Sequence, residues 1–155
     1  MDLDKDLAAA KEASYTLFAA QRTLDDARDD FKDTAEANMY NTGKYQYVAA
    51  QHQWQAAQYT YNAAVQSFET SFRTLYLQVK DYQQVLQAAK TALAMEQDNF
   101  AAAQKKHDLG NLSDNALADA KDKVSEAQDK VDGAAIDLFS AYNNYHWAVD
   151  HGILN

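Results

Sequence analysis

Residues 47–107 read YVAAQHQWQAAQYTYNAAVQSFETSFRTLYLQVKDYQQVLQAAKTALAMEQDNFAAAQKKH. Counting from Tyr47 in alternating steps of four and three residues, every position is apolar or aromatic except Gln51, Gln58, Glu96 and His107. This spacing gathers apolar side chains into one stripe along a helix, as in a coiled coil. Because the stripe continues for about eight heptads, it predicts one helix over 46–106, about 90 Å long at 1.5 Å per residue.

Two further apolar stripes flank the long helix. Behind it, the same spacing continues over 117–148 without an exception and predicts a helix over 113–149. In front of it, a weaker stripe over 17–31 predicts a helix over 4–38. Aspartates crowd the outer side of this first helix, and since aspartate is a poor helix former, we expect it to be the least stable of the three.

Two glycine-centred turns separate the predicted helices. Gly43 lies in a turn at 40–44, and Gly110 lies in a turn at 108–112. Glycine accepts the left-handed backbone conformation that commonly closes a helix. We therefore expect an all-α fold, an elongated antiparallel coiled coil of three helices with a central helix of about 60 residues, in a single helical domain over 1–155.

The composition argues against several classes of function. The chain has 155 residues, a formal net charge of −9, and neither cysteine nor proline. The negative charge disfavours nucleic acid as a partner, because a basic face is the usual footprint of such proteins. No apolar run approaches the about 20 residues of a membrane span, and the sequence shows no signal peptide.

Polar residues give no pattern typical of a metal centre, a cofactor site or an active site. His146 and His151 are five residues apart, which places them off a common helical face. The acidic run at 25–33 lacks the glycine-centred loop of a calcium site. No glycine-rich phosphate loop and no signature of a catalytic nucleophile is present. We therefore expect a protein that is not an enzyme and holds neither metal nor cofactor.

Aromatic residues outside the main stripes indicate an interaction surface. Tyr59 and Tyr76 lie off the stripe of the long helix, and Phe139 and Tyr142 lie off the stripe of the last one. Three helices cannot bury apolar residues on more than one face each, and exposed apolar stripes usually mark an interface. We expect association with a partner or with further copies of the chain.

Several short motifs resemble the outer-membrane efflux protein family of the TolC type. The stretch 88–145 is similar to the closing helical hairpin of that family, with Gly110 and Ser113 at the turn and Leu117-Ala118-Asp119-Ala120 shortly after it. The stretch 7–31 resembles the helical segment that precedes the strands of the family. Residues 40–43 resemble its glycine motif before the long helix.

The resemblance implies a function and a location. Family members are trimers whose long helices form a periplasmic tube, and the tip of the hairpin meets the adaptor protein of an export pump. The corresponding tip residues here are Asp108, Leu109, Gly110, Asn111, Leu112 and Ser113. Asp119 is the candidate for the acidic residue near the constriction of the tube. The implied location is periplasmic or otherwise extracytoplasmic.

The sequence departs from the family at two places. The interval between Phe31 and Gly43 leaves no room for the β-barrel strands, so this chain resembles only the α-helical hairpin part. Leu112 stands where some members carry a basic residue, which argues against a charge-locked gate.

The alternative function is that of a helical bundle that binds lipid or a small ligand. Such a bundle needs a wide apolar face, usually with basic flanks. Here the flanks mix lysine with aspartate, as at 121–132.

Overall fold

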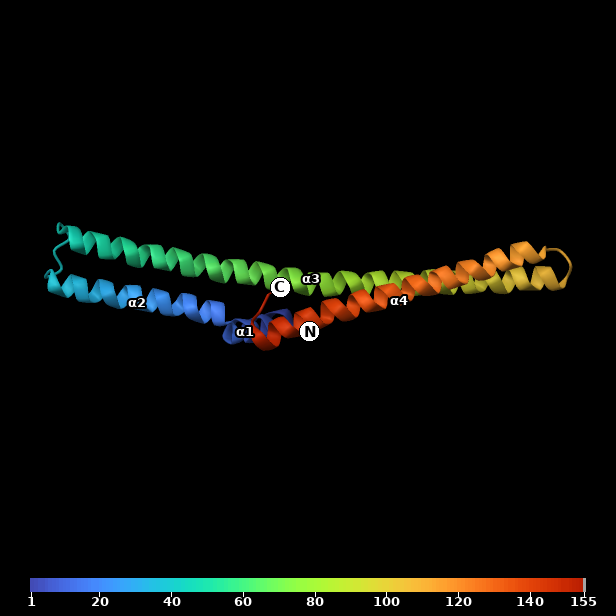
Figure 1. The fold of residues 1–155 in the computed structure, drawn as a ribbon, viewed down its shortest axis with the longest axis horizontal. Helices are drawn as coiled ribbons and strands as arrows, with labels where there is room; N and C mark the ends of the chain where they lie inside the picture. The colour runs from blue at the N-terminus through green and yellow to red at the C-terminus, as the bar shows by residue number, and fades with distance from the viewer. Residues whose placement is uncertain (155) are drawn as a thin grey trace. The chain divides into compact units, whose positions relative to one another are not determined.

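Figure 1 shows the computed structural model of the chain, which describes residues 1–154. Its helices are α1 (Leu3–Ala13), α2 (Tyr15–Ala37), α3 (Tyr45–Asp108) and α4 (Asp114–His151), and no strand occurs within the described residues. The predicted all-α class is confirmed, and so is the presence of one long helix, since α3 has 64 residues.

The chain divides into two compact units. The first comprises residues 1–74 and 146–154, and the second comprises residues 75–145. In the first unit, α2 runs antiparallel beside the first part of α3 (Figure 1). In the second unit, the remainder of α3 and most of α4 form an antiparallel helical hairpin (Figure 1).

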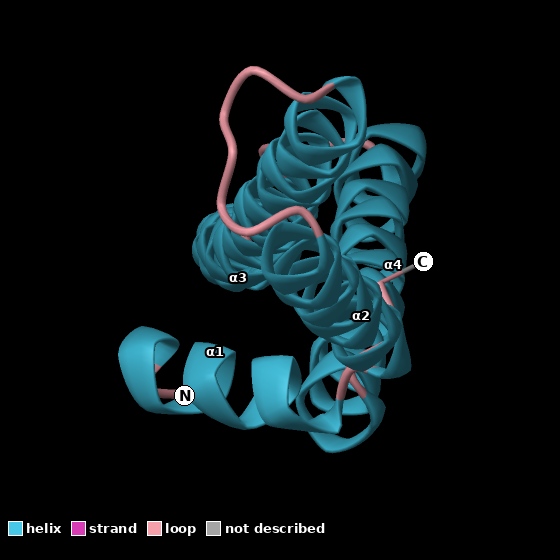
Figure 2. Cartoon of the chain, turned by 90° about the vertical axis from the view of Figure 1, so that its left-hand side faces the viewer, coloured by secondary structure: helices cyan, strands magenta, loops and turns pink. Residues whose placement is uncertain are grey.

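The predicted single helix over 4–38 is wrong, because the chain leaves the helical conformation at Ser14, with φ −76° and ψ 110°. The Ser14 side chain accepts a hydrogen bond from the backbone N–H of Leu17 at 3.4 Å and so caps the start of α2. Serine offers the backbone this alternative to a continuous helix. Figure 2 shows α1 turned across the direction of α2. Residues 1–154 therefore form four helices where three were predicted.

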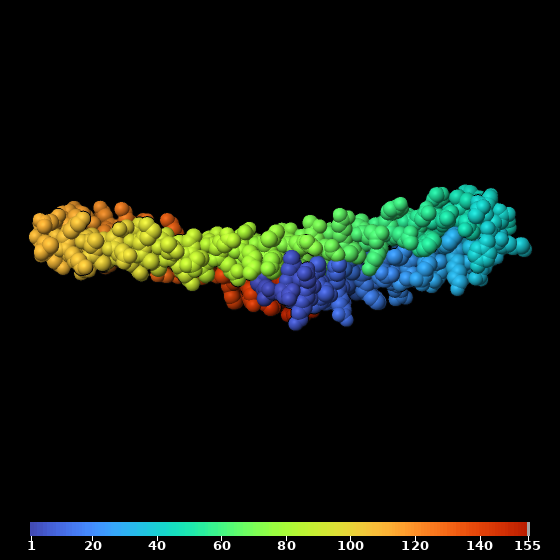
Figure 3. Space-filling model, turned by 180° about the vertical axis from the view of Figure 1, so that it is seen from behind, coloured from blue at the N-terminus to red at the C-terminus, as the bar shows by residue number. Residues whose placement is uncertain are grey.

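The segment α1 is held against α3 by both polar and apolar contacts. Lys11 forms an ion pair with Glu69, and the hydrogen bond from Lys11 lowers the pKa of the Glu69 carboxyl. Leu7 and Ala10 are buried on the inner side of α1. Figure 3 shows the N-terminal residues packed against α3 of the first unit.

Burial follows the predicted stripes closely. Every stripe position of α3 from Tyr47 to His107 is buried or half-buried, and so is every stripe position of α4 over 117–148. Phe72 and Val79 are fully buried. Between residues 80 and 126, however, no side chain is fully buried, and the stripe residues there remain half-buried.

The turn between α2 and α3 is closed by residues other than the predicted glycine. The N–H groups of Met39 and Tyr40 donate to the carbonyls of Glu36 and Ala35 at 2.9 and 2.8 Å. Met39 and Tyr40 hold the left-handed conformation, with φ 52° and 55°. Gly43 does not have a positive φ, and its N–H donates to the Asn41 side chain at 3.0 Å. The prediction that Gly43 closes the helix is therefore wrong.

Candidate functional site: the tip of the helical hairpin

The turn at the tip of the second unit is closed by backbone hydrogen bonds around Gly110. The N–H of Gly110 donates to the carbonyl of His107 at 2.7 Å, and the N–H of Asn111 donates to that of Lys106 at 2.9 Å. This pair of bonds is the Schellman motif, which requires a left-handed residue just after the helix. Gly110 supplies it, with φ 75°. The last carbonyls of α3 are thus satisfied within the turn itself.

Ser113 begins the next helix. Its side-chain oxygen accepts a hydrogen bond from the N–H of Ala116 at 3.3 Å, and its carbonyl accepts one from the N–H of Leu117 at 3.1 Å. Asp114 places a carboxylate in the first turn of α4, where negative charge is favoured by the helix dipole. Only three residues, 111–113, separate Gly110 from α4, so both ends of the turn are fixed.

A side-chain hydrogen bond crosses the turn. Nε2 of His107, in the last turn of α3, lies 2.7 Å from Oδ1 of Asp114. Nδ1 of the same ring lies 3.8 Å from Oδ1 of Asp108. The hydrogen bond to Asp114 raises the pKa of His107 above 6.5, because the carboxylate stabilises the charged imidazolium. The ring therefore ties the two helices together most firmly when it is protonated.

The tip presents one large apolar side chain within a polar rim. Leu109 is 75% exposed. Asp108, Gly110, Asn111 and Ser113 are also exposed, whereas Leu112 is half-buried. The six predicted tip residues thus lie together in one turn, at the end of the helix pair (Figure 3). This arrangement offers a partner an apolar contact surrounded by hydrogen-bonding groups.

Asp119 does not belong to this set. It lies on the exposed side of α4, beyond the contact between His107 and Asp114. No group of three or more His, Cys, Asp or Glu side chains in residues 1–154 is arranged to hold a metal ion. Over the same residues, none of the helices combines the length and the apolarity that crossing a membrane requires.

A second exposed surface lies on α4 in the same unit. Ile136 and Phe139 are each 66% exposed, and Tyr142 is 42% exposed. A hollow of about 340 Å³ is lined by Phe139, Tyr142, Leu138, Ala135 and Gln83. Two of the aromatic residues predicted to lie off the main stripes, Phe139 and Tyr142, are therefore neighbours on one open surface. Tyr76, also predicted to lie off the stripe, instead packs against Tyr145 with ring centres 6.1 Å apart.

Sequence reasoning missed the contact between His107 and Asp114. His107 occupies a stripe position, where the helix faces its partner, and Asp114 is the first residue of α4. A short turn between two antiparallel helices brings the end of one stripe next to the start of the following helix. The sequence signal that could have revealed this contact is a histidine and an aspartate seven residues apart, with Gly110 between them.

Comparison of the chain with protein-family models, with curated proteins and with solved structures gives no match. The resemblance to the efflux family thus depends on the short motifs of the sequence alone.

Proposed function

We propose that the chain is a non-enzymatic helical part of an export duct, similar to the periplasmic coiled coil of an outer-membrane efflux protein. In this proposal it docks to the adaptor protein of an export pump through residues 108–113. The observation that carries the proposal is the tip turn, whose backbone is closed at both ends while Leu109 remains 75% exposed.

A closed turn suits docking for a thermodynamic reason. Binding costs free energy whenever loops and side chains must become ordered, and a preorganised surface avoids part of that cost. Here the Schellman hydrogen bonds of Gly110 and Asn111 and the Ser113 cap order the backbone before any partner arrives. The exposed Leu109 would supply the apolar anchor, and the polar groups around it would set the orientation.

The second unit also supports assembly of several copies into a coiled coil with more helices. Its stripe residues between 80 and 126 stay half-buried when only α3 and α4 cover them. Phe139 and Tyr142 add an apolar surface on the outer side of α4. Further helices from other copies would cover both, and the family resemblance suggests three copies. The same resemblance suggests a periplasmic or extracytoplasmic location.

Site-specific crosslinking in cells tests the docking. A photoreactive amino acid at Asn111, an exposed tip residue, should crosslink to an adaptor protein identifiable by mass spectrometry. The same amino acid at Asp122, exposed on α4 away from the tip, is the matched control and should not. Adaptor crosslinks of equal yield from both positions, or from neither, would contradict docking through the tip.

Vesicle flotation separates this proposal from the lipid-binding alternative. The chain should stay at the bottom of the gradient with neutral phosphatidylcholine vesicles, because the apolar stripes of α3 and α4 are already buried or half-buried within the protein. Flotation with the vesicles would favour the lipid-binding bundle instead.

A further inference from the structure

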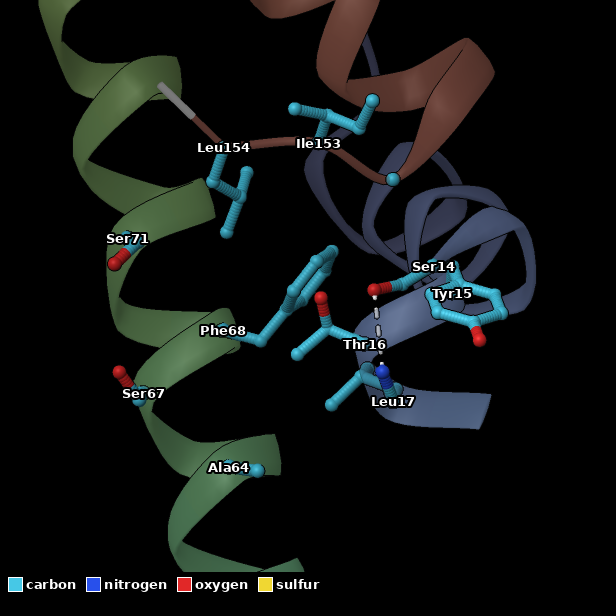
Figure 4. A pocket seen from close by; sticks show the side chains of 11 residues that line it. Ser14, Tyr15, Thr16, Leu17, Ala64, Ser67, Phe68, Ser71, Ile153 and Leu154 are labelled. Carbon is cyan, nitrogen blue, oxygen red and sulfur yellow. Dashed lines mark hydrogen bonds between the residues drawn. The ribbon is translucent and has the colours of Figure 1, made fainter. Parts of the chain in front are cut away.

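The first unit contains a pocket that the docking proposal does not use. It has a volume of about 370 Å³ and lies among the junction of α1 and α2, the middle of α3 and the segment after α4. Figure 4 shows Phe68 of α3 turned toward Thr16 and Leu17 of α2, with Leu154 lying above the ring. The volume falls within the range of about 300–1,000 Å³ that is typical of small-molecule sites.

Ser14, at the helix break, and Gly152 both line this pocket and lie in close contact with each other. Ser14 is 1% exposed. Gly152 lies so close to it that an added Cβ would be 2.4 Å from both Cα and N of Ser14. Gly152 also has φ +61°, a conformation that favours glycine. Any larger residue at 152 must force the segment 152–154 and the junction of α1 and α2 apart, which changes the wall of the pocket.

The lining determines the class of ligand. None of the eleven residues around the pocket carries a formal charge. An ionised ligand would lose part of its hydration without meeting an opposite charge, so a neutral one is favoured. Phe68 and Leu17, each 7% exposed, and Ala64 supply apolar surface, and Thr16 supplies a hydroxyl for one hydrogen bond. The Phe68 ring favours an aromatic ligand, because rings gain from offset or edge-to-face packing.

We propose that the first unit binds a neutral, largely apolar aromatic molecule between Phe68, Leu17 and the segment 152–154. The site is independent of the tip turn, since its lining residues and those of the tip belong to different units. Failure of the docking proposal would therefore leave this one unaffected.

Fluorescence titration of the full chain with N-phenyl-1-naphthylamine, a neutral aromatic probe, tests the site. We expect saturable, blue-shifted emission with one probe bound per chain. Ala64→Phe should fill the pocket, and Gly152→Ala should displace its wall, so each should weaken the affinity by about tenfold or more. Met95→Ser, which removes an exposed apolar side chain from the second unit, is the matched control and should bind as the wild type does.

Circular dichroism checks that each variant keeps its helicity. If Gly152→Ala does not fold, Ala64→Phe decides alone, because its side chain enters existing space. Absence of saturable binding, wild-type affinity in the folded Ala64→Phe and Gly152→Ala variants, or loss of binding in Met95→Ser would each overturn the proposal.

Discussion

The apolar stripe of α3 is buried more deeply at 68–79 than at 82–107, as one phenylalanine from each unit shows. In the first unit, α1, α2 and the end of α4 share the cover of α3, and Phe72 is fully buried. In the second, α4 alone accompanies α3, and Phe100 stays half-buried although it occupies an equivalent stripe position. The spacing of apolar residues therefore fixes which side of a helix faces inward, while the packing around each position fixes how deeply its side chain is buried, as the fully buried Val79 of the second unit also shows.

Truncating one phenylalanine in each unit tests this difference most strongly. Phe72→Ala should cost about 3–5 kcal/mol of unfolding free energy, the usual range for a buried phenylalanine. Phe100→Ala should cost about half as much in the monomer, because part of its ring is already in water. Urea unfolding of dilute protein gives both values. Equal losses in dilute protein would show that the second unit buries its stripe as deeply as the first.

Leu138→Ala examines the α4 side of the second unit. Leu138 is a half-buried stripe residue, so the substitution should destabilise the chain by about 2 kcal/mol, the lower end for leucine truncation. Thermal or urea unfolding followed by circular dichroism measures the change. A loss below about 0.5 kcal/mol, as is usual for surface positions, would mean that Leu138 does not lie on the side of α4 that faces α3.

The tip turn and the turn between α2 and α3 differ in which residue adopts the left-handed conformation. Gly110→Val tests the tip turn. A Cβ at Gly110 meets nothing within 4 Å, so the cost should be backbone strain alone, about 1–2 kcal/mol. Hydrogen exchange should increase at the tip while the rest of the chain is unchanged.

Gly133→Ala, inside α4 with equally open space around the added Cβ, should instead stabilise the folded protein by about 0.5–1 kcal/mol.

Met39→Gly makes the opposite change in the other turn. Met39 has φ 52° and is 88% exposed, so glycine relieves strain without removing packing. The added freedom of the unfolded chain offsets part of the gain, which leaves a stabilisation of up to about 1 kcal/mol. The midpoint of thermal unfolding should rise slightly. A fall would indicate that the Met39 side chain contributes a contact that outweighs the strain.

The smallest expected effect is the pH dependence of the tip. The folded-state pKa of His107 is raised, so its stabilising contribution is complete below the unfolded value near 6.5 and is lost as pH rises through the folded value. NMR titration of the ring should show the raised pKa in the wild type and a lower one in Asp114→Asn. An unchanged pKa in that variant would rule out Asp114 as the main cause.

Heptad spacing was sufficient to predict much of the fold from the sequence. Every stripe position of α3 and α4 is buried or half-buried, because helical periodicity leaves only one side of a long helix for the core, and Ala50 is buried in addition although it lies beside the stripe. The tip turn was also predictable, since Gly110 between two capping residues is a local signal. Other features depend on contacts between distant residues. The break at Ser14 occurs where Gly152 approaches the backbone, and the only local signal for it is one serine that can cap a helix within an otherwise continuous helical pattern.

The turn at 38–44 and the tip contact show the same limit. Two non-glycine residues, Met39 and Tyr40, close α2. Because glycine is the usual residue at such a position, the sequence points to Gly43 instead. Neither His107 nor Asp114 belongs to a recognisable motif, and only the folded hairpin brings Nε2 of His107 to 2.7 Å from Oδ1 of Asp114. Local conformational preference predicts where a turn lies. It does not predict which residue adopts the left-handed conformation or which side chains meet across the turn.

Molar mass in solution tests most directly whether further copies of the chain complete the half-buried stripe of the second unit. Sedimentation equilibrium over a wide range of concentrations should give a mass that rises from the 17.3 kDa of one chain toward that of a trimer. Phe139→Ser should shift this association to higher concentration, because it removes an exposed apolar side chain. A mass of one chain at every concentration would contradict assembly through the hairpin.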